Sequence, residues 1–194
     1  MKKIITCLLT FACVAIYSCS GSKAKDGSVN GSNLPQESVY NLKTVWEDQN
    51  GDSLQLKELH GKIPVMSMIF TRCAYACPRI IADMKAVASQ VPGDKKDKVV
   101  FVLVSFDSDN DNAARLKQFA SQMQLNSQWI LLRGDAEQVR ELSMILNIKY
   151  KKQPDGSFSH SNVLSILGPD GVIEGQSEGL GVNPEVLISK IKEL

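Results

Sequence analysis

Two segments of the chain, 63–70 and 99–106, are almost continuously apolar. Apolar runs of this length are typical of strands that are buried on both faces of a sheet. Apolar residues recur every three or four positions elsewhere, and the helices that this spacing predicts are 78–90, 112–123, 136–146 and 184–194. Shorter apolar segments predict further strands at 129–132, 163–167 and 172–176. Strands that alternate with helices in this way indicate an α/β domain.

The first part of this domain has the pattern of a β-hairpin. Segments 39–46 and 53–56 are strand-like, and the Asn50-Gly51 pair between them supplies the positive φ angles that a tight turn requires. The segment 149–161 is polar, and we expect a loop there. The order of elements predicts an α/β, thioredoxin-like fold with an N-terminal β-hairpin and helices on both faces of a central mixed sheet.

The first 19 residues resemble a bacterial lipoprotein signal. Two lysines precede an apolar run at 4–16, which is shorter than the roughly 20 residues that span a bilayer. The run ends at Ser18-Cys19, a small residue before a cysteine, as in the lipobox. Cleavage there would make Cys19 the lipidated first residue. An ordinary cleaved signal peptide and an uncleaved anchor are the alternatives.

This pattern divides the chain into three parts. We predict a lipoprotein signal peptide at 1–18, a flexible tether at 19–37, which is rich in Ser, Gly, Asn and Lys, and a folded domain at 38–194. We expect a lipid anchor to hold the domain on the periplasmic, extracytoplasmic side of a bacterial membrane. The formal net charge of +1 leaves no basic excess for a phosphate backbone, so we do not expect nucleic acid as a partner.

The predicted domain keeps two cysteines, Cys73 and Cys77, where a buried strand ends and a helix begins. Open α/β sheets place their sites at this crevice. Proline is favoured at the first helical position, so Pro78 predicts that Cys77 caps the helix and that Cys73 lies in the preceding loop. A helix N-terminus favours the thiolate form, which makes the pair nucleophilic, able to bind a metal ion, or both. A structural disulfide is the alternative, although so small a loop constrains the unfolded chain little.

Two thiolates suit Cu(I) or zinc, and a histidine could complete the ligand set. The chain has two histidines. His60 lies in the turn before the first central strand, at the opposite end from Cys73, and we expect it in solvent. His160 directly precedes the strand at 163–167, in a loop that can overhang the helix cap, and is the candidate third ligand.

Six short motifs occur together in this domain. They are Phe70-Thr71-Arg72-Cys73, Cys77-Pro78, Val104-Ser105-Phe106-Asp107, Leu116-Lys117-Gln118-Phe119-Ala120, His160-Ser161 and Gly168-Pro169-Asp170-Gly171. Together they resemble the Sco (SenC/PrrC-type) family of copper chaperones, from about residue 42 to the C-terminus. The resemblance implies a thioredoxin-like fold in which Cys73, Cys77 and His160 bind copper, as Cu(I), Cu(II) or both. It also implies that Asp107 is an additional ligand or lies behind the ligands.

The resemblance further implies a role in delivering copper during the assembly of cytochrome c oxidase. The expected partners are a copper-accepting subunit of a respiratory oxidase and a thiol reductant protein that keeps the dithiol reduced. A thiol-disulfide oxidoreductase that reduces the copper-site cysteines of the oxidase would use the same pair without His160. A redox or copper sensor is a further alternative, and so is an interaction module that docks an acidic partner on Lys149, Lys151 and Lys152.

Overall fold

The computed structural model describes residues 34–194. The predicted signal peptide at 1–18, the predicted lipidation site Cys19 and the tether as far as residue 33 lie outside the described residues. The last four tether residues, 34–37, are described. Leu34 packs against the core, and the Asn41 side chain donates hydrogen bonds to the backbone carbonyls of residues 35 and 36. Packing against the domain therefore begins before residue 38.

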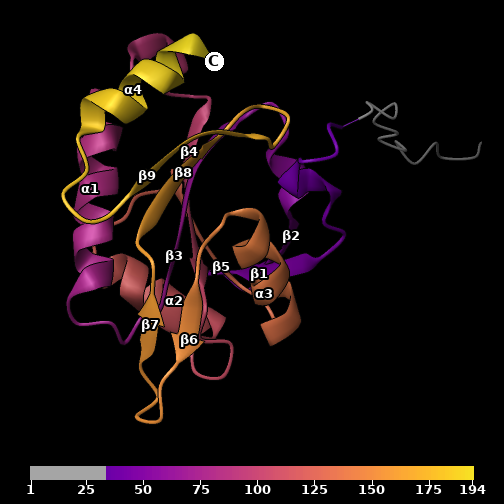
Figure 1. Ribbon diagram of the computed structural model, residues 1–194, viewed down its shortest axis with the longest axis vertical. Coiled ribbons are helices and arrows are strands. Elements are labelled where there is room, and N and C mark those ends of the chain that lie inside the picture. The colour runs from indigo at the N-terminus through magenta and orange to yellow at the C-terminus, as the bar shows by residue number, and fades with distance from the viewer. Residues whose placement is uncertain (1–33) are drawn as a thin grey trace, which may run out of the picture. The chain divides into compact units, whose positions relative to one another are not determined.

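A seven-stranded mixed sheet forms the centre of the described domain, in the order β2-β1-β5-β4-β3-β8-β9 (Figure 1). Its central strands β3, β4 and β5 are parallel, and the other pairs are antiparallel. The strands are β1 Val45–Asp48, β2 Ser53–Gln55, β3 Ile63–Ile69, β4 Val99–Ser105, β5 Trp129–Arg133, β8 Val163–Leu167 and β9 Ile173–Glu178. Every residue of β3 is buried, and one of the seven in β4 is only partly buried. The predicted pair of central strands is confirmed.

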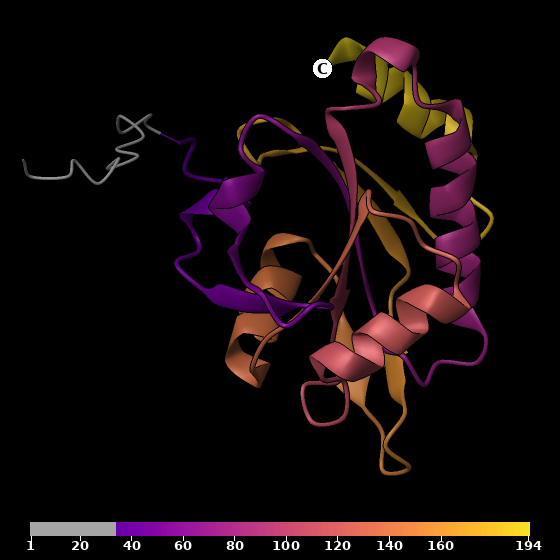
Figure 2. The same cartoon turned by 180° about the vertical axis from the view of Figure 1, so that it is seen from behind.

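Helices cover both faces of this sheet, as predicted. Helices α1, α2 and α4 lie on one face and α3 lies on the other (Figure 2). The α-helices are α1 Ala76–Gln90, α2 Ala113–Gln122, α3 Ala136–Ile145 and α4 Pro184–Glu193, and the short 3-10 helices are η1 Val39–Asn41, η2 Leu56–Leu59 and η3 Gly93–Lys95. Within residues 34–194, no helix has the length and apolar character needed to cross a membrane.

The predicted N-terminal hairpin is present as β1 and β2, but its turn differs from the prediction. Glu47 pairs with Ser53, so five residues connect the paired positions. Gly51 has a φ of 87°, whereas Asn50 does not adopt positive φ. The Asp48 carboxylate accepts the backbone N–H groups of residues 50 and 52 and so stabilises this longer turn. The first predicted strand is also shorter, because residues 39–41 form η1.

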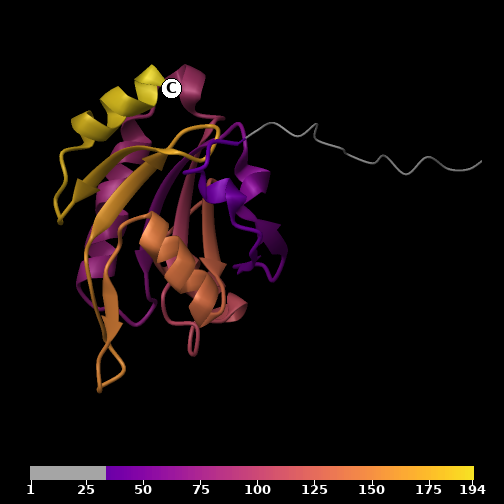
Figure 3. The same cartoon turned by 45° about the vertical axis from the view of Figure 1, so that its right-hand side comes forward.

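The loop predicted at 149–161 is wrong, because this segment forms a second hairpin. Strands β6 Tyr150–Lys152 and β7 Phe158–His160 pair as a separate two-stranded sheet. The hairpin projects from the end of the domain at which α1 begins (Figures 1 and 3). Its polar composition hid the strands, since only Tyr150 and Phe158 supply apolar surface, and these partly buried rings pack against Phe106 at the edge of the core.

Candidate functional site

Two thiols and one imidazole converge at the carboxyl ends of β3 and β4. Cys73 lies in the loop after β3, Cys77 in the first turn of α1, and His160 at the end of β7. Their potential ligand atoms all lie within 4.8 Å of one another. Cys77 is fully buried and Cys73 is partly exposed. The structure thus brings together the three residues that the sequence singled out, from segments more than 80 residues apart.

The start of α1 differs from the prediction by two residues. The helix begins at Ala76, and Tyr75 at its N-cap makes no side-chain capping hydrogen bond. Pro78 therefore occupies the third helical position, where its missing N–H still costs no intrahelical bond. Cys77 lies inside the first turn, and its backbone N–H donates to the Cys73 sulfur at 3.3 Å. The Cys73 side chain thus accepts one of the free N–H groups at the helix N-terminus.

This arrangement gives the two thiols opposite acidities. The hydrogen bond from the Cys77 side chain is the largest cause that lowers the pKa of Cys73, from an ordinary 9.0 to about 5. The backbone N–H groups of residues 75–77, at the N-cap and in the first helical turn, also lower this pKa, and partial burial opposes them. The hydrogen bond with Cys73 and burial raise the pKa of Cys77 well above its usual range. The expectation that both sulfurs favour the thiolate therefore holds for Cys73 alone.

The His160 ring is oriented by a backbone hydrogen bond. Its Nδ1 lies 3.1 Å from the carbonyl oxygen of Ser161. A carbonyl oxygen only accepts, so Nδ1 is the donor in this hydrogen bond, and the bond turns Nε2 away from the Ser161 carbonyl. A donor bond from one ring nitrogen to a backbone carbonyl is the usual support for a metal-binding histidine.

Aromatic packing holds the β6–β7 hairpin against the sheet. The His160 ring lies 4.9 Å from Phe106 and 6.1 Å from Phe70, measured between ring centroids. Phe158 packs 5.2 Å from Phe70, and Tyr150 stacks on Phe106 at 5.1 Å. Phe70 directly follows β3 and Phe106 directly follows β4. The ends of the two central strands therefore form the apolar platform on which His160 rests.

Asp107 lies beside the site, but it is not in the group of converging ligand atoms. Its carboxylate is buried and accepts hydrogen bonds from Arg72 Nη2 at 2.8 Å and from the Asn110 amide at 2.8 Å. Both carboxylate oxygens thus have partners within the chain. The structure places Asp107 behind the ligands, where it holds the residue that precedes Cys73.

Asp111 is a buried carboxylate that the sequence analysis missed. It accepts the backbone N–H of Thr71 at 3.0 Å, the Thr71 hydroxyl at 2.6 Å and the Ser105 hydroxyl at 2.6 Å. These bonds fasten the loop that leads to Cys73 to the end of β4. An aspartate that follows a strand in a run of polar residues gives little sign of burial, so the sequence carried no clear signal for it.

His60 takes no part in this group. It follows η2 at the start of β3, it is exposed, and its ring lies 6.2 Å from that of Tyr40. This position agrees with the expected turn at the opposite end of the strand from Cys73.

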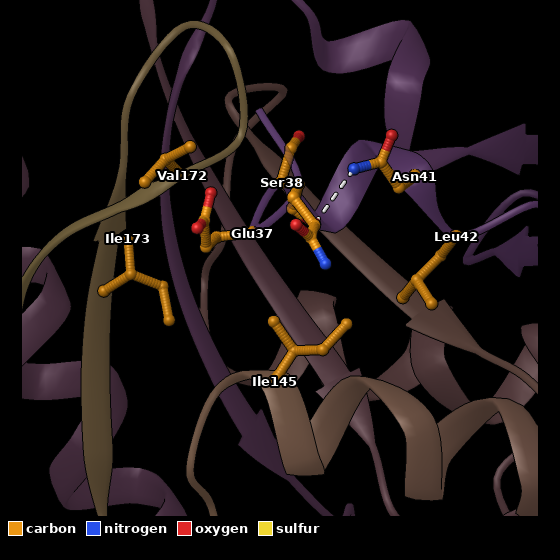
Figure 4. A pocket seen from close by; sticks show the side chains of 8 residues that line it. Glu37, Ser38, Asn41, Leu42, Ile145, Val172 and Ile173 are labelled. Atoms are coloured by element: carbon orange, nitrogen blue, oxygen red, sulfur yellow. Dashed lines mark hydrogen bonds between the residues drawn. The ribbon is translucent and has the colours of Figure 1, made fainter. Parts of the chain in front are cut away.

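Two cavities of similar size lie in different parts of the domain. The first, of about 430 Å³, lies between the segment before β1, the end of α3 and the start of β9 (Figure 4). Its Ser38 hydroxyl is bonded to the Asp170 carbonyl and its Asn41 amide to residues 35 and 36, while the exposed residues Gln36 and Glu37 complete its polar lining. The second, of about 410 Å³, is lined by Cys73 and His160 together with Tyr75, an exposed aromatic side chain. We assign the chemistry to the second cavity because it alone of the two contains a thiol and an imidazole.

The comparisons with known proteins match this arrangement. The SCO1/SenC family model matches residues 40–194. A candidate copper-binding protein of Stutzerimonas stutzeri is 30% identical over 147 residues, which is 73% of this chain and 70% of that protein. The crystal structure of a SCO1/SenC family lipoprotein from Bacillus anthracis is 26% identical, with a TM-score of 0.71, over 78% of this chain and 92% of that chain.

A second solved structure is similar to the same extent. It is that of BsSco, described as a member of the Sco family of cytochrome c oxidase assembly proteins that carries a disulfide switch. It is 26% identical, with a TM-score of 0.67, over 77% of this chain and 90% of that chain. With the family model covering the whole described domain from residue 40 onward, the chain belongs to the SCO1/SenC family.

Proposed function

We propose that this protein is a membrane-tethered copper chaperone that delivers copper during the assembly of cytochrome c oxidase. The observation that carries the proposal is the convergence of Cys73, Cys77 and His160 to within 4.8 Å. Thiolate sulfur suits Cu(I), and an imidazole allows Cu(II) as well. Each chain holds one copper ion through these three side chains, and the ion is cargo rather than a permanent part of the fold.

The relatives support both halves of the proposal. The Stutzerimonas stutzeri protein is described as a candidate copper-binding protein, and BsSco as a member of the Sco family of cytochrome c oxidase assembly proteins. The copper acceptor is a subunit of a respiratory oxidase. The Bacillus anthracis relative is described as a lipoprotein, which supports a lipid anchor at Cys19. Such an anchor would hold the domain on the extracytoplasmic, periplasmic side of the membrane.

Redox state controls loading in this account. A disulfide between Cys73 and Cys77 leaves no thiolate to bind an ion. Its reduction takes two electrons and two protons, which a dithiol of a thiol reductant protein supplies as it becomes a disulfide. Copper binds only after this step.

A second function, thiol-disulfide oxidoreduction, is favoured by the opposite acidities of the two cysteines. The Cys73 thiolate would attack a disulfide of the oxidase subunit and displace one of its sulfurs as a thiolate. Cys77 would then lose its proton and attack Cys73, which releases the second sulfur of the subunit. The subunit gains two electrons from this chain, one proton from Cys77 and one proton from water, and this chain is left with a disulfide. This route uses both cysteines and does not need His160.

Deletion of the gene and complementation test the proposal. Loss of the protein is expected to lower the copper content of the oxidase, and added copper is expected to restore part of it. The His160→Ala variant should fail to complement under copper limitation, whereas His60→Ala should complement fully. Rescue by an added reductant and by His160→Ala would instead support the oxidoreductase. Normal oxidase copper in the deletion strain under copper limitation would contradict both functions and favour a sensor.

A further inference from the structure

The position of His160 depends on contacts outside the central sheet. His160 ends β7, and β6 and β7 form a two-stranded sheet of their own within the described domain. A two-stranded hairpin is marginally stable by itself. Its aromatic residues rest on Phe70 and Phe106, but packing of this kind leaves the tip of the hairpin unsupported.

Among the described residues, one side chain from outside the hairpin bonds that tip. Arg72 Nη2 donates to the backbone carbonyl of Gly156 at 3.1 Å. The same guanidinium donates to the Asp107 carboxylate from Nη2 at 2.8 Å and from Nε at 3.2 Å. Charge-assisted bonds to a carboxylate are stronger than neutral ones and fix the plane of the guanidinium. Asp107 is buried and held in turn by Asn110, so Arg72 has a firm support on one side and the hairpin on the other.

Arg72 thus forms a bridge between Asp107 and Gly156, and the residues that this bridge joins lie next to the candidate metal ligands. Arg72 directly precedes Cys73, and Gly156 lies four residues before His160. A single side chain therefore connects the loop that carries one sulfur ligand with the hairpin that carries the imidazole.

A second ion pair on the same hairpin provides a contrast. Lys152 in β6 donates to Asp109 at 2.6 Å. Lys152 and Arg72 are exposed to a similar extent, but the Asp109 side chain is 75% exposed whereas that of Asp107 is 1% exposed. Exposed pairs of this kind contribute little, because water screens them and both side chains lose conformational freedom. Lys152 is therefore a matched control for the loss of a positive charge near the hairpin.

We propose that Arg72 is a positioning residue that holds the β6–β7 hairpin, and with it His160, over Cys73 and Cys77. The effect of this positioning on copper binding rests on the proposed function, in which His160 is a copper ligand. Arg72 donates nothing to the ion itself. It lowers the cost of bringing the third ligand to the dithiol, as residues behind metal ligands generally do.

Hydrogen exchange of the metal-free, reduced domain tests the bridge without copper. The amides of Gln153 and Ser161 report on the hairpin, since they donate to Ser157 and Lys149. Arg72→Met is expected to speed their exchange about three- to tenfold, which corresponds to the net value of one hydrogen bond. Lys152→Met should leave these rates close to those of the wild type. Unchanged rates in Arg72→Met would overturn the proposal. If Arg72→Met alone leaves Asp107 unpaired and unfolds the chain, Arg72→Met with Asp107→Asn serves instead.

Copper affinity then tests the consequence, through a double-mutant cycle with His160→Ala. Arg72→Met is expected to weaken copper binding about tenfold when His160 is present. This is the lower end of the loss in metal affinity seen when a residue that supports a metal ligand is replaced. It should have no effect when His160 is already alanine. An equal loss in both backgrounds would mean that Arg72 acts on the dithiol or on the fold, and would overturn the positioning role. A wild-type chain that binds no copper would refute the proposed function, while the exchange rates would still decide the bridge.

Discussion

The backbone N–H of Cys77 donates to the sulfur of Cys73 across 3.3 Å, so the helix that carries one cysteine stabilises the thiolate of the other. The Cys77 thiol adds a second, stronger contribution. One sulfur is thus ionised and partly exposed at neutral pH, while its neighbour is protonated and buried. Because of this difference, we expect Cys73 to bind the ion or attack the partner first, and Cys77 to react second.

The first prediction concerns the reactivity of Cys73 toward an alkylating reagent. Only the thiolate reacts, so the rate should rise with pH through the pKa of about 5 and be constant between pH 6 and 8. Cys77→Ala removes the main hydrogen-bond donor and should move this inflection to higher pH. Cys77→Ser keeps an O–H donor at the same place and should move it less. An inflection near pH 9 in the wild type would contradict the hydrogen-bonded geometry.

His160→Ala should separate metal binding from redox chemistry. The substitution removes one ligand from the hairpin and leaves both cysteines and the hydrogen bond between them in place, so copper affinity should fall while the potential of the Cys73–Cys77 disulfide changes little. Competition with a copper chelator and equilibration with a thiol buffer measure the two quantities. His60→Ala is the matched control and should alter neither. A wild-type copper affinity in His160→Ala would favour the oxidoreductase over the chaperone.

Asp111 offers a test of how the loop before Cys73 is held. Asp111→Ala removes the acceptor of three buried donors, which are the backbone N–H and the hydroxyl of Thr71 and the hydroxyl of Ser105. We expect a loss of about 3 kcal/mol in the free energy of unfolding, measured with a chemical denaturant. Asp111→Asn retains an acceptor, and hydroxyl groups can turn to accept from its amide, so its loss should be clearly smaller. A negligible loss in both variants would mean that these hydrogen bonds contribute little.

Gly134 tests the packing of the first hairpin on the sheet. A Cβ at this position would lie 2.8 Å from the Trp46 ring and 2.5 Å from the Gln138 side chain. Gly134→Ala should therefore destabilise the domain by about 2 kcal/mol. Gly93→Ala is the control, because nothing lies within 4 Å of its Cβ and its φ is not positive, and it should be neutral or slightly stabilising. Comparable unfolding midpoints for both variants would place β1 differently on β5.

The order of the main strands and helices could be predicted because the buried face of each element determines the spacing of its apolar residues along the sequence. The continuous apolar runs at 63–70 and 99–106 correspond to β3 and β4, and each helical stripe corresponds to a helix. Those signals are local. The β6–β7 hairpin lacks one, because its strands are stabilised by Tyr150 and Phe158 against Phe106, a residue more than 40 positions away.

In the candidate site, too, some residues could be predicted from the sequence and others depend on contacts between distant parts of the chain. Cys73, Cys77 and His160 could be selected because thiols and histidines are few in this chain, so their residue types carried the signal. The residues that support them could not be selected. Arg72 and Asp111 are of common types, and their roles depend on Gly156 and Thr71, which only the folded chain brings near. The opposite acidities of the cysteines also follow from one being buried, which their spacing does not reveal.

Anaerobic titration of the reduced domain with copper tests most directly whether Cys73, Cys77 and His160 bind one copper ion. We expect one Cu(I) per wild-type chain, with sulfur and nitrogen neighbours in the X-ray absorption spectrum. Cys73→Ser and Cys77→Ser should each abolish stoichiometric binding, because the soft ion loses one of its two sulfur ligands. Retention of one copper per chain in either serine variant would contradict the account.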